Sequence, residues 1–219
     1  MKVVAVVPMK LNNQRLPGKN TRCFSDGTPL CNSIFSTLLN VKLIDEIYVF
    51  CSDPQIVQYI PDGIKYIERS KSLDQNCTTM NEVLKSFTSI ISSDIYILTH
   101  ATAPFVSKES IEKGLRAVLN NGFDSAFSVK KVQDFLWKDG KPINYKLNDI
   151  PRTQDLPIIY EETCGFYIFQ EHLIKNMNRR IGDNPFMVEV SEIEAIDVDT
   201  HIDFEIADAI YTKIINKEE

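Results

Sequence analysis

Short apolar runs alternate with amphipathic stretches over the first 125 residues of the chain. Strand patterns occur at 2–8, 44–51, 64–68 and 94–99, and a polar loop and a helical pattern follow each one. The helical patterns cover 29–39, 55–60, 80–91 and 108–120, the last with Ser107 as its expected N-cap. This alternation predicts an α/β fold with a mainly parallel, Rossmann-like sheet and helices on both faces. In such a fold, ligands bind beyond the carboxyl ends of the strands.

The alternation ends after Ser125. Residues 126–145 are strand-like, with a hairpin turn expected at Asp139 and Gly140, and residues 150–157 form a polar loop bounded by prolines. Further strands are predicted at 164–169, 187–190 and 195–198, before a closing amphipathic helix at 202–215. We predict a single domain over residues 1–219, from which residues 126–150 project as a small strand-rich arm suited to dimerisation.

Composition narrows the class of protein. The 219 residues include 24 Lys and Arg against 30 Asp and Glu, for a formal charge of -6. The acidic balance argues against broad nucleic-acid binding, and the longest apolar run, 3–9, is too short to cross a bilayer. The five cysteines form no CxxC pair and no zinc-site spacing, which is typical of thiols in a reducing compartment. We therefore expect a cytoplasmic protein that binds neither membranes nor nucleic acid.

A basic loop follows the first predicted strand. It reads KLNNQRLPGKN over residues 10–20 and carries three cations, Lys10, Arg15 and Lys19. At this place in an α/β sheet, side chains and backbone amides can converge on phosphate groups. The loop has one glycine, Gly18, and matches neither the dinucleotide fingerprint nor the Walker loop. Spacing alone leaves a phosphate site and a solvated basic loop equally open.

Four stretches, in order along the chain, resemble the CMP-sugar synthetases. These cytidylyltransferases activate sialic acids, related nonulosonic acids and Kdo. The stretches are VPMKLNNQRLPGKN at 7–20, LDQNCTT at 73–79, PRTQDLP at 151–157 and IDVDT at 196–200. The resemblance implies a homodimeric nucleotidyltransferase that transfers CMP from CTP to the anomeric hydroxyl of an acidic sugar and releases pyrophosphate. It also implies Mg²⁺ or Mn²⁺ as cofactor.

The resemblance assigns one group of residues to the nucleotide. The expected nucleotide-binding residues are Lys10, Asn12, Asn13, Arg15, Lys19, Asn20, Arg69, Thr78 and Thr79. The residues expected to act in catalysis are Lys10, Arg15, Lys19 and Asp199. The family usually has arginine in place of Lys10 and Lys-Gly in place of Gln14 and Arg15, so the basic charge is kept but shifted. As alternatives, Arg69 is a surface arginine and Thr79 is the N-cap of the next helix.

A second group is assigned to the acceptor. The expected acceptor-binding residues are His100, Arg152, Gln154, Glu162 and Tyr167. His100 replaces a family glutamine that touches the acyl substituent of the sugar, which indicates an altered acceptor. Arg152 corresponds to an arginine that binds the acceptor's carboxylate, a task suited to a planar guanidinium. The alternatives are a structural histidine and an exposed ion pair.

Asp197 and Asp199 are the expected metal ligands. On an extended segment, side chains at i and i+2 share a face, so two like charges project together and a divalent cation would relieve their repulsion. That ion would offset the charge that accumulates when the sugar hydroxyl attacks the α-phosphate. The alternative is local, because Thr200 and Asp203 resemble the capping box of the last helix.

Several functional hypotheses stay open. The first is CMP transfer to a nonulosonic acid, and the second keeps the enzyme but changes the acceptor to Kdo or another acid. The third is a nucleotide-binding module without turnover, against which the paired aspartates count. An NAD-dependent dehydrogenase is least favoured, because the chain lacks the glycine-rich turn.

Overall fold

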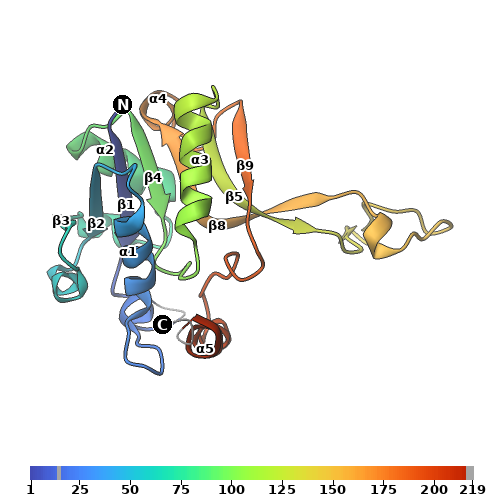
Figure 1. The fold of residues 1–219 in the computed structure, drawn as a ribbon, viewed down its shortest axis with the longest axis horizontal. Coiled ribbons are helices and arrows are strands. Elements are labelled where there is room, and N and C mark those ends of the chain that lie inside the picture. The colour runs from blue at the N-terminus through green and yellow to red at the C-terminus, as the bar shows by residue number, and fades with distance from the viewer. Residues whose placement is uncertain (14–15, 216–219) are drawn as a thin grey trace.

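The computed structural model describes residues 1–13 and 16–215, and the side chains up to residue 213. Arg15, expected to bind phosphate, lies outside the described residues. The central sheet has seven strands in the order β3-β2-β1-β4-β8-β5-β9 (Figure 1). Its strands are β1 (Val3–Met9), β2 (Glu46–Cys51), β3 (Ile64–Glu68), β4 (Ile95–Thr99), β5 (Ser125–Val132), β8 (Ile159–Gln170) and β9 (Pro185–Glu189).

The pairing confirms the mainly parallel sheet. β1 pairs in parallel with β2 and β4, β2 with β3, and β5 with β9. The exception is β8, which lies between β4 and β5 and is antiparallel to both. All parallel strands therefore end at one edge of the sheet, where ligands are expected.

Helices cover both faces of the sheet, as predicted. They are α1 (Leu30–Asn40), α2 (Met80–Ile90), α3 (Lys108–Asn120), α4 (Glu171–Met177) and α5 (His201–Ile210), the last followed by a π-helical turn at Tyr211–Ile215. One face packs against α1 and α3 and the other against α2 and α4 (Figure 1). Every residue of β1 is buried, and alternate side chains enter the two cores because successive strand residues point to opposite faces. The helix α5 lies beyond the carboxyl ends of the strands (Figure 1).

One helix was not predicted, and one predicted strand is absent. The helix α4 was not expected, because its seven residues show too little periodicity to stand out. The predicted strand at 195–198 is wrong. Those residues form a turn and an extended loop, in which Val198 N donates to Thr102 O at 2.7 Å.

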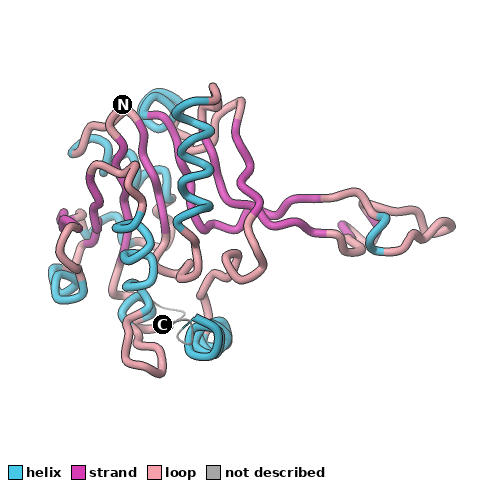
Figure 2. The backbone as a smooth tube through the Cα atoms, in the orientation of Figure 1, coloured by secondary structure: helices cyan, strands magenta, loops and turns pink. Residues whose placement is uncertain are grey.

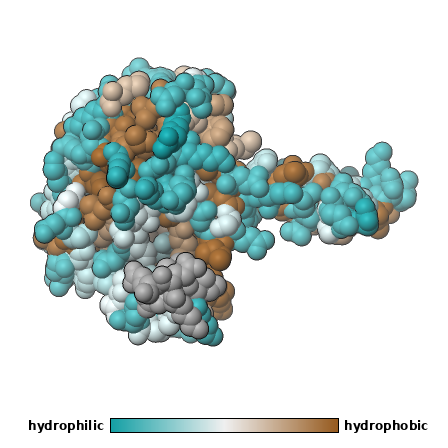
Figure 3. All heavy atoms as spheres, viewed as in Figure 1, coloured by the Kyte–Doolittle hydropathy of each residue, from teal (hydrophilic) through white to brown (hydrophobic). Residues whose placement is uncertain are grey.

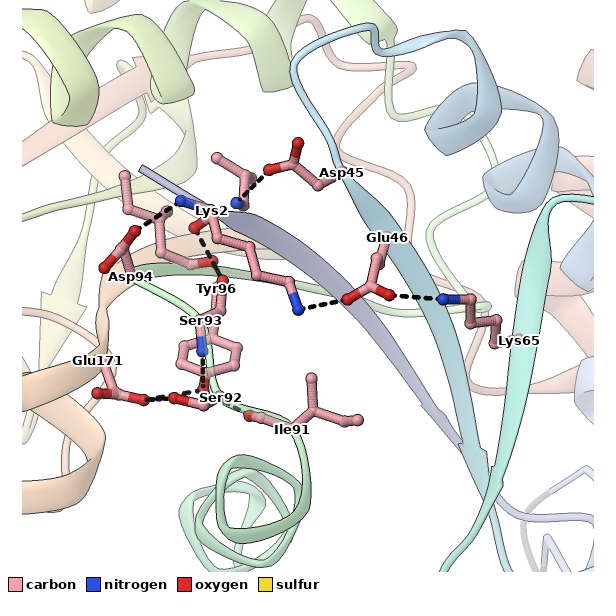
Figure 4. Close-up of polar contacts among 12 residues, drawn as sticks. Lys2, Asp45, Glu46, Lys65, Ile91, Ser92, Ser93, Asp94, Tyr96 and Glu171 are labelled. Atoms are coloured by element: carbon pink, nitrogen blue, oxygen red, sulfur yellow. Dashed lines mark hydrogen bonds and ion pairs between the residues drawn. The ribbon is translucent and has the colours of Figure 1, made fainter.

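Polar contacts connect the amino ends of the strands, at the edge of the sheet opposite to the one where ligands are expected (Figure 4). The backbone N–H of Lys2 donates to Asp94 at 2.6 Å, and that of Val3 donates to Asp45 at 2.7 Å. Glu46 lies 2.5 Å from the amines of both Lys2 and Lys65. Hydrogen bonds from these two lysines lower the pKa of Glu46 to about 2. These contacts connect neighbouring strands at the edge of the sheet away from the expected ligand site.

An arm projects from the sheet. The strands β5 and β8 run out of the sheet together, and the short strands β6 (Trp137–Lys138) and β7 (Lys141–Pro142) form a hairpin beyond them (Figures 1 and 2). Asp139 and Gly140 both have positive φ, which confirms the predicted turn. The predicted range 126–150 begins inside β5, where Ala126 and Phe127 still pair with β9, so the arm starts later and extends to β8.

Apolar side chains on the arm are exposed. Phe135, Trp137, Ile143, Leu147 and Ile150 are all at least 40% exposed, and apolar patches interrupt the polar surface of the arm in Figure 3. No helix in the described part of the chain has the length and apolar character needed to span a membrane. The five cysteines are free thiols.

Candidate active site

A cavity of about 410 Å³ lies at the carboxyl ends of the parallel strands. Three of its residues each follow directly on one strand: Lys10 after β1, Arg69 after β3, and His100 after β4. The cavity brings together nine of the residues predicted from the sequence: Lys10, Asn13, Lys19, Asn20, Arg69, Thr78, His100, Asp197 and Asp199. Cys164 and Arg180, which were not predicted, also line it.

The basic loop is folded into this cavity. Gly18 has a φ of 66°, a left-handed conformation that suits glycine, and a 3-10 turn at Lys19–Thr21 follows it. The amide of Asn20 donates to Lys10 O at 3.0 Å, and Lys10 Nζ donates to Asp74 O at 3.2 Å. The Lys19 side chain is only 11% exposed. A fully solvated loop, one of the two alternatives for this segment, is therefore wrong.

Arg69 is buried, in contrast to the surface alternative. The residue is 4% exposed, and its Nη2 lies 2.5 Å from Asp74 Oδ1. The second carboxylate oxygen of Asp74 accepts from Ser52 Oγ at 2.5 Å. Arg69 Nε is buried without a hydrogen-bond partner among the described residues. The loop after β3 thus holds a fixed guanidinium at the cavity wall.

Asp197 and Asp199 both line the cavity from the extended loop before α5. Val198 between them is fully buried, so the alternation expected of an extended segment is present without a strand. Lys19 Nζ lies 2.9 Å from Asp199 Oδ1. Burial is the main cause that raises the pKa of Asp197, and the nearby charge of Asp199 adds to it.

The aspartate pair fits a divalent cation. Asp197 Oδ1 is buried without a hydrogen-bond partner in the described structure. A buried, unmatched carboxylate oxygen beside a second carboxylate is stabilised by a cation. The described residues contain no cluster of three or more His, Cys, Asp or Glu side chains able to hold a metal. Two carboxylates suit Mg²⁺, which keeps several of its waters.

The local alternative for this segment is also present. Thr200 is the N-cap of α5 and forms a capping box with Asp203. The cap uses Thr200 rather than Asp199. Capping and an aspartate pair at the cavity therefore coexist.

His100 and Arg180 form the other side of the cavity. Burial, together with the positive charges of Arg180 and Lys19, lowers the pKa of His100 to about 4. The guanidinium of Arg180 lies over the Tyr167 ring at 4.2 Å, and its Nη1 lies 3.3 Å from Asn81 Oδ1. Arg180 follows α4, whose C-cap Asn178 is left-handed with a φ of 53°. The sequence signal for it was an Arg-Arg pair in an acidic chain, but its direction depends on the unpredicted helix.

Some predicted acceptor residues lie elsewhere. The Tyr167 side chain is buried in the core, and its hydroxyl hydrogen-bonds to Glu162. Arg152 and Gln154 belong to the arm, outside the residues that line the cavity of their own chain. The Arg152 side chain is 73% exposed and pairs with Asp155 at 2.7 Å.

Two predicted nucleotide residues are also outside the cavity lining. Thr79 is the N-cap of α2 and forms a capping box with Glu82, which confirms the alternative for this residue. Asn12 lines a separate hollow of about 210 Å³ beside Asp74. A larger cavity of about 590 Å³ lies at the base of the arm, and Asp197 lines both it and the cavity described above.

Cations and a carboxylate pair beyond the carboxyl ends of a mainly parallel sheet suit a nucleotide's phosphates together with a divalent cation, the requirement of an α/β nucleotidyltransferase. The model of one family, described as Cytidylyltransferase, matches residues 4–213. The chain therefore belongs to the cytidylyltransferase family, which confirms the resemblance seen in the sequence.

Curated relatives within this family act on different acidic sugars, by their names. The chain is 27% identical over 227 residues to the CMP-N,N'-diacetyllegionaminic acid synthase of Legionella pneumophila, covering 96% of each. It is 25% identical over 211 residues to the 3-deoxy-manno-octulosonate cytidylyltransferase of Escherichia coli, covering 87% of this chain and 81% of the relative. It is 21% identical to the N-acylneuraminate cytidylyltransferase A of Danio rerio. The chain spans about half the length of that relative and of the Oncorhynchus mykiss enzyme.

Solved structures share the fold. A CMP:2-keto-3-deoxy-manno-octonic acid synthetase complexed with CTP matches with a TM-score of 0.74 at 19% identity, over 100% of both chains. A 4-diphosphocytidyl-2C-methyl-D-erythritolsynthase from Anaerococcus prevotii matches with a TM-score of 0.70 at 16% identity, over 97% of this chain and 96% of that one. Both matches confirm the α/β architecture predicted from the sequence.

Proposed function

We propose that this chain transfers CMP from CTP to the anomeric hydroxyl of a sialic acid-like nonulosonic acid, with release of pyrophosphate. One observation carries the proposal: a single cavity holds Lys10 and Lys19 together with the Asp197 and Asp199 pair. Family membership supports cytidylyl transfer, and the relatives' names support an acidic sugar as acceptor.

The basic loop and the Arg69 wall provide the nucleotide site in this proposal. Lys10, Lys19 and the amide of Asn20 bind the triphosphate, whose charges they offset at the end of β1. Arg69, held by Asp74, lies on the base side of the nucleotide. A guanidinium fixed by an ion pair and burial loses little freedom when the nucleotide binds.

Asp197 and Asp199 would hold Mg²⁺ or Mn²⁺. When bound, the ion supplies positive charge that stabilises the phosphate oxygens during transfer. The chain's own contribution is positional. Lys19 pairs with Asp199 at 2.9 Å, which places its ammonium beside the phosphates and keeps the Asp199 side chain directed into the cavity. Lys19 can then stabilise the negative charge that develops on pyrophosphate as the bond between the α- and β-phosphates of CTP breaks.

His100 belongs to the acceptor side. Because its pKa is about 4, the imidazole is neutral near pH 7 and contacts the sugar by hydrogen bonding rather than by charge. In this role the imidazole takes the place of the family glutamine that touches the acyl substituent of the sugar. A neutral ring also avoids adding a positive charge beside Lys19 and Arg180.

The proposal includes a homodimer that forms through the arm. Exposed apolar side chains on a thin projection favour burial against another surface, and a second copy of the chain is the occupant that the family resemblance implies. Arg152 lies on this arm, so its predicted contact with the acceptor carboxylate requires the arm of one copy to reach the cavity of the other. A substitution on the arm that prevents dimerisation should therefore also weaken acceptor binding.

The direct experiment measures pyrophosphate release. CTP, ATP, GTP and UTP are each offered with N-acetylneuraminic acid, N,N'-diacetyllegionaminic acid or Kdo, with and without Mg²⁺. We expect release with CTP and a nonulosonic acid only when the metal is present. Release with Kdo alone would favour the alternative acceptor. CTP binding without pyrophosphate release in the presence of any of the acids would indicate a binding module and overturn the proposal.

A further inference from the structure

Arg180 places a second strong cation in the cavity, away from the phosphate-binding loop. It comes from the loop after α4, and its neighbours are Asn81 at the start of α2 and Glu162 and Tyr167 on β8. The charges of both Lys19 and Arg180 act on His100, which lines the same cavity as these two cations. The nucleotide and acceptor sides of the cavity thus each have their own positive charge.

The residues around Arg180 fix the position of its guanidinium, but no carboxylate of the described residues forms a close ion pair with it. The Tyr167 ring supports it at 4.2 Å, and one hydrogen bond of 3.3 Å runs from its Nη1 to Asn81. Its Nε lacks a hydrogen-bond partner within the described ranges. The nearest acid, Glu162, is 3.7 Å from its Nη2, and the same Glu162 oxygen is already hydrogen-bonded to the Tyr167 hydroxyl.

Resting on the proposed function, we infer that Arg180 binds the carboxylate of the acidic sugar within the same chain. A guanidinium can donate two parallel hydrogen bonds to a carboxylate, which a long contact to Glu162 does not satisfy. The side chain is 26% exposed, so such a pair is only partly screened by water. The sugar's carboxylate then lies on the His100 side of the cavity, with its anomeric hydroxyl directed toward the phosphates.

Arg152, the residue that the family resemblance assigns to the carboxylate, has a different environment. It is 73% exposed and already forms two hydrogen bonds with Asp155, at 2.7 and 3.1 Å. An arginine whose Nε and Nη2 already meet a carboxylate must exchange that partner before the same edge of the guanidinium binds another. Arg180 needs no such exchange, because Glu162 is too distant for a hydrogen bond.

The test compares an acid with its amide. Binding of N-acetylneuraminic acid, N,N'-diacetyllegionaminic acid and Kdo, and of their carboxamides, is measured by calorimetry with CMP and Mg²⁺ present. The proteins are wild type, Arg180→Gln, Arg180→Lys and the control Arg179→Gln. Arg179 is adjacent in sequence but pairs with Asp183 at 2.7 Å and does not line the cavity. Thermal unfolding and CTP affinity report whether each variant folds and keeps its nucleotide site.

We expect the wild type and Arg179→Gln to bind one acid at least about 30-fold more tightly than its amide. Arg180→Gln should bind acid and amide about equally, while CTP affinity changes less than about threefold. Arg180→Lys should show an intermediate preference, since lysine keeps the charge but loses the fork.

The inference is overturned if Arg180→Gln, or Arg180→Lys should the first variant not fold, retains the full preference of the wild type for the acid. It is also overturned if the wild type binds none of the acids, or does not prefer them to the amides. These outcomes are independent of turnover. A wild type that binds an acid through Arg180 but releases no pyrophosphate would refute the proposed function alone.

Discussion

Removing Asp74 should destabilise the protein, because it leaves Arg69 buried without its counter-ion. In the native structure the Arg69 side chain is 4% exposed and that of Asp74 is 13% exposed, with 2.5 Å between Nη2 and Oδ1. The substitution Asp74→Ala also takes the acceptor from Ser52. It leaves the backbone carbonyl that accepts from Lys10 in place. The perturbation is therefore confined to one buried charge and one hydroxyl.

The expected loss is about 3 kcal/mol of unfolding free energy, the lower end of the range for breaking a buried ion pair, because Arg69 also borders the cavity. Unfolding entropy is about 2.1 cal/mol/K per residue, so 219 residues give about 0.46 kcal/mol/K. The melting temperature should therefore fall by about 6 to 7 °C.

Thermal unfolding followed by circular dichroism measures this effect, and Asp155→Ala is the matched control. That variant breaks a second Arg–Asp pair, between Arg152 and Asp155, whose side chains are 73% and 47% exposed. An exposed pair contributes about 0 to 1 kcal/mol, so the control should shift the melting temperature by no more than about 2 °C. Asp74→Asn, which keeps one acceptor, should fall between the two.

Equal shifts for Asp74→Ala and Asp155→Ala would refute the reasoning, since burial would then make no difference to the cost of an unpaired arginine. A rise in melting temperature for Asp74→Ala would show that the pair is destabilising as a whole. Urea unfolding with an unchanged slope excludes a change in the amount of surface exposed.

Three further predictions follow from the site and the arm. Asp197→Asn should raise the melting temperature in metal-free buffer near pH 7 and lower turnover by at least about a hundredfold, because the ionised carboxylate is destabilising above its raised pKa. The gain should vanish as the pH falls below 3.8, the usual pKa of the carboxyl, because the unfolded chain is then protonated as well; an unchanged melting temperature at pH 7 contradicts this. His100→Gln should remove a loss of stability that the wild type shows between pH 7.5 and 5, about 2 kcal/mol, because the unfolded chain binds a proton near 6.5 and the folded chain only near 4. Parallel stability curves for wild type and His100→Gln would rule this out. Leu147→Asp, at a position 64% exposed on the arm, should convert a dimer to a monomer in light scattering, and a monomeric wild type would count against the proposed assembly.

Elements with a complete local signal were predictable from the sequence. The helix at 108–120 has the predicted bounds, and Ser107 accepts from Ser110 N as its N-cap. The helix α4 was missed because its burial depends on Leu173 and Ile174 meeting α2, which no local pattern reveals. The strand β8 begins at Ile159 rather than 164, because its outer part is exposed on both faces in the arm and lacks apolar alternation.

The site was predictable where its residues are contiguous. Lys10 and Lys19 lie in one loop, and Asp197 and Asp199 are two residues apart, so each group was recognisable as a unit. Arg180 was not, because its place depends on the unpredicted helix and on the turn at Asn178. The sequence alone also did not show which predicted residues line the cavity and which lie on the arm. His100 and Arg152, for example, lie on opposite sides of β5 in the chain, and only the tertiary structure places them in different parts of the molecule.

The antiparallel strand β8 has a consequence for how the chain folds. The strands β1 to β4 come from the first 99 residues, but β4 receives its second neighbour only when residues 159–170 are available. During synthesis the nucleotide half of the sheet can therefore pair before the acceptor half exists. In that interval one edge of β4, whose residues are all buried in the folded protein, remains unpaired. Such an edge is a template for association between chains. We expect a chain truncated near residue 150 to aggregate, and chaperones to bind the growing full-length chain until β8 emerges.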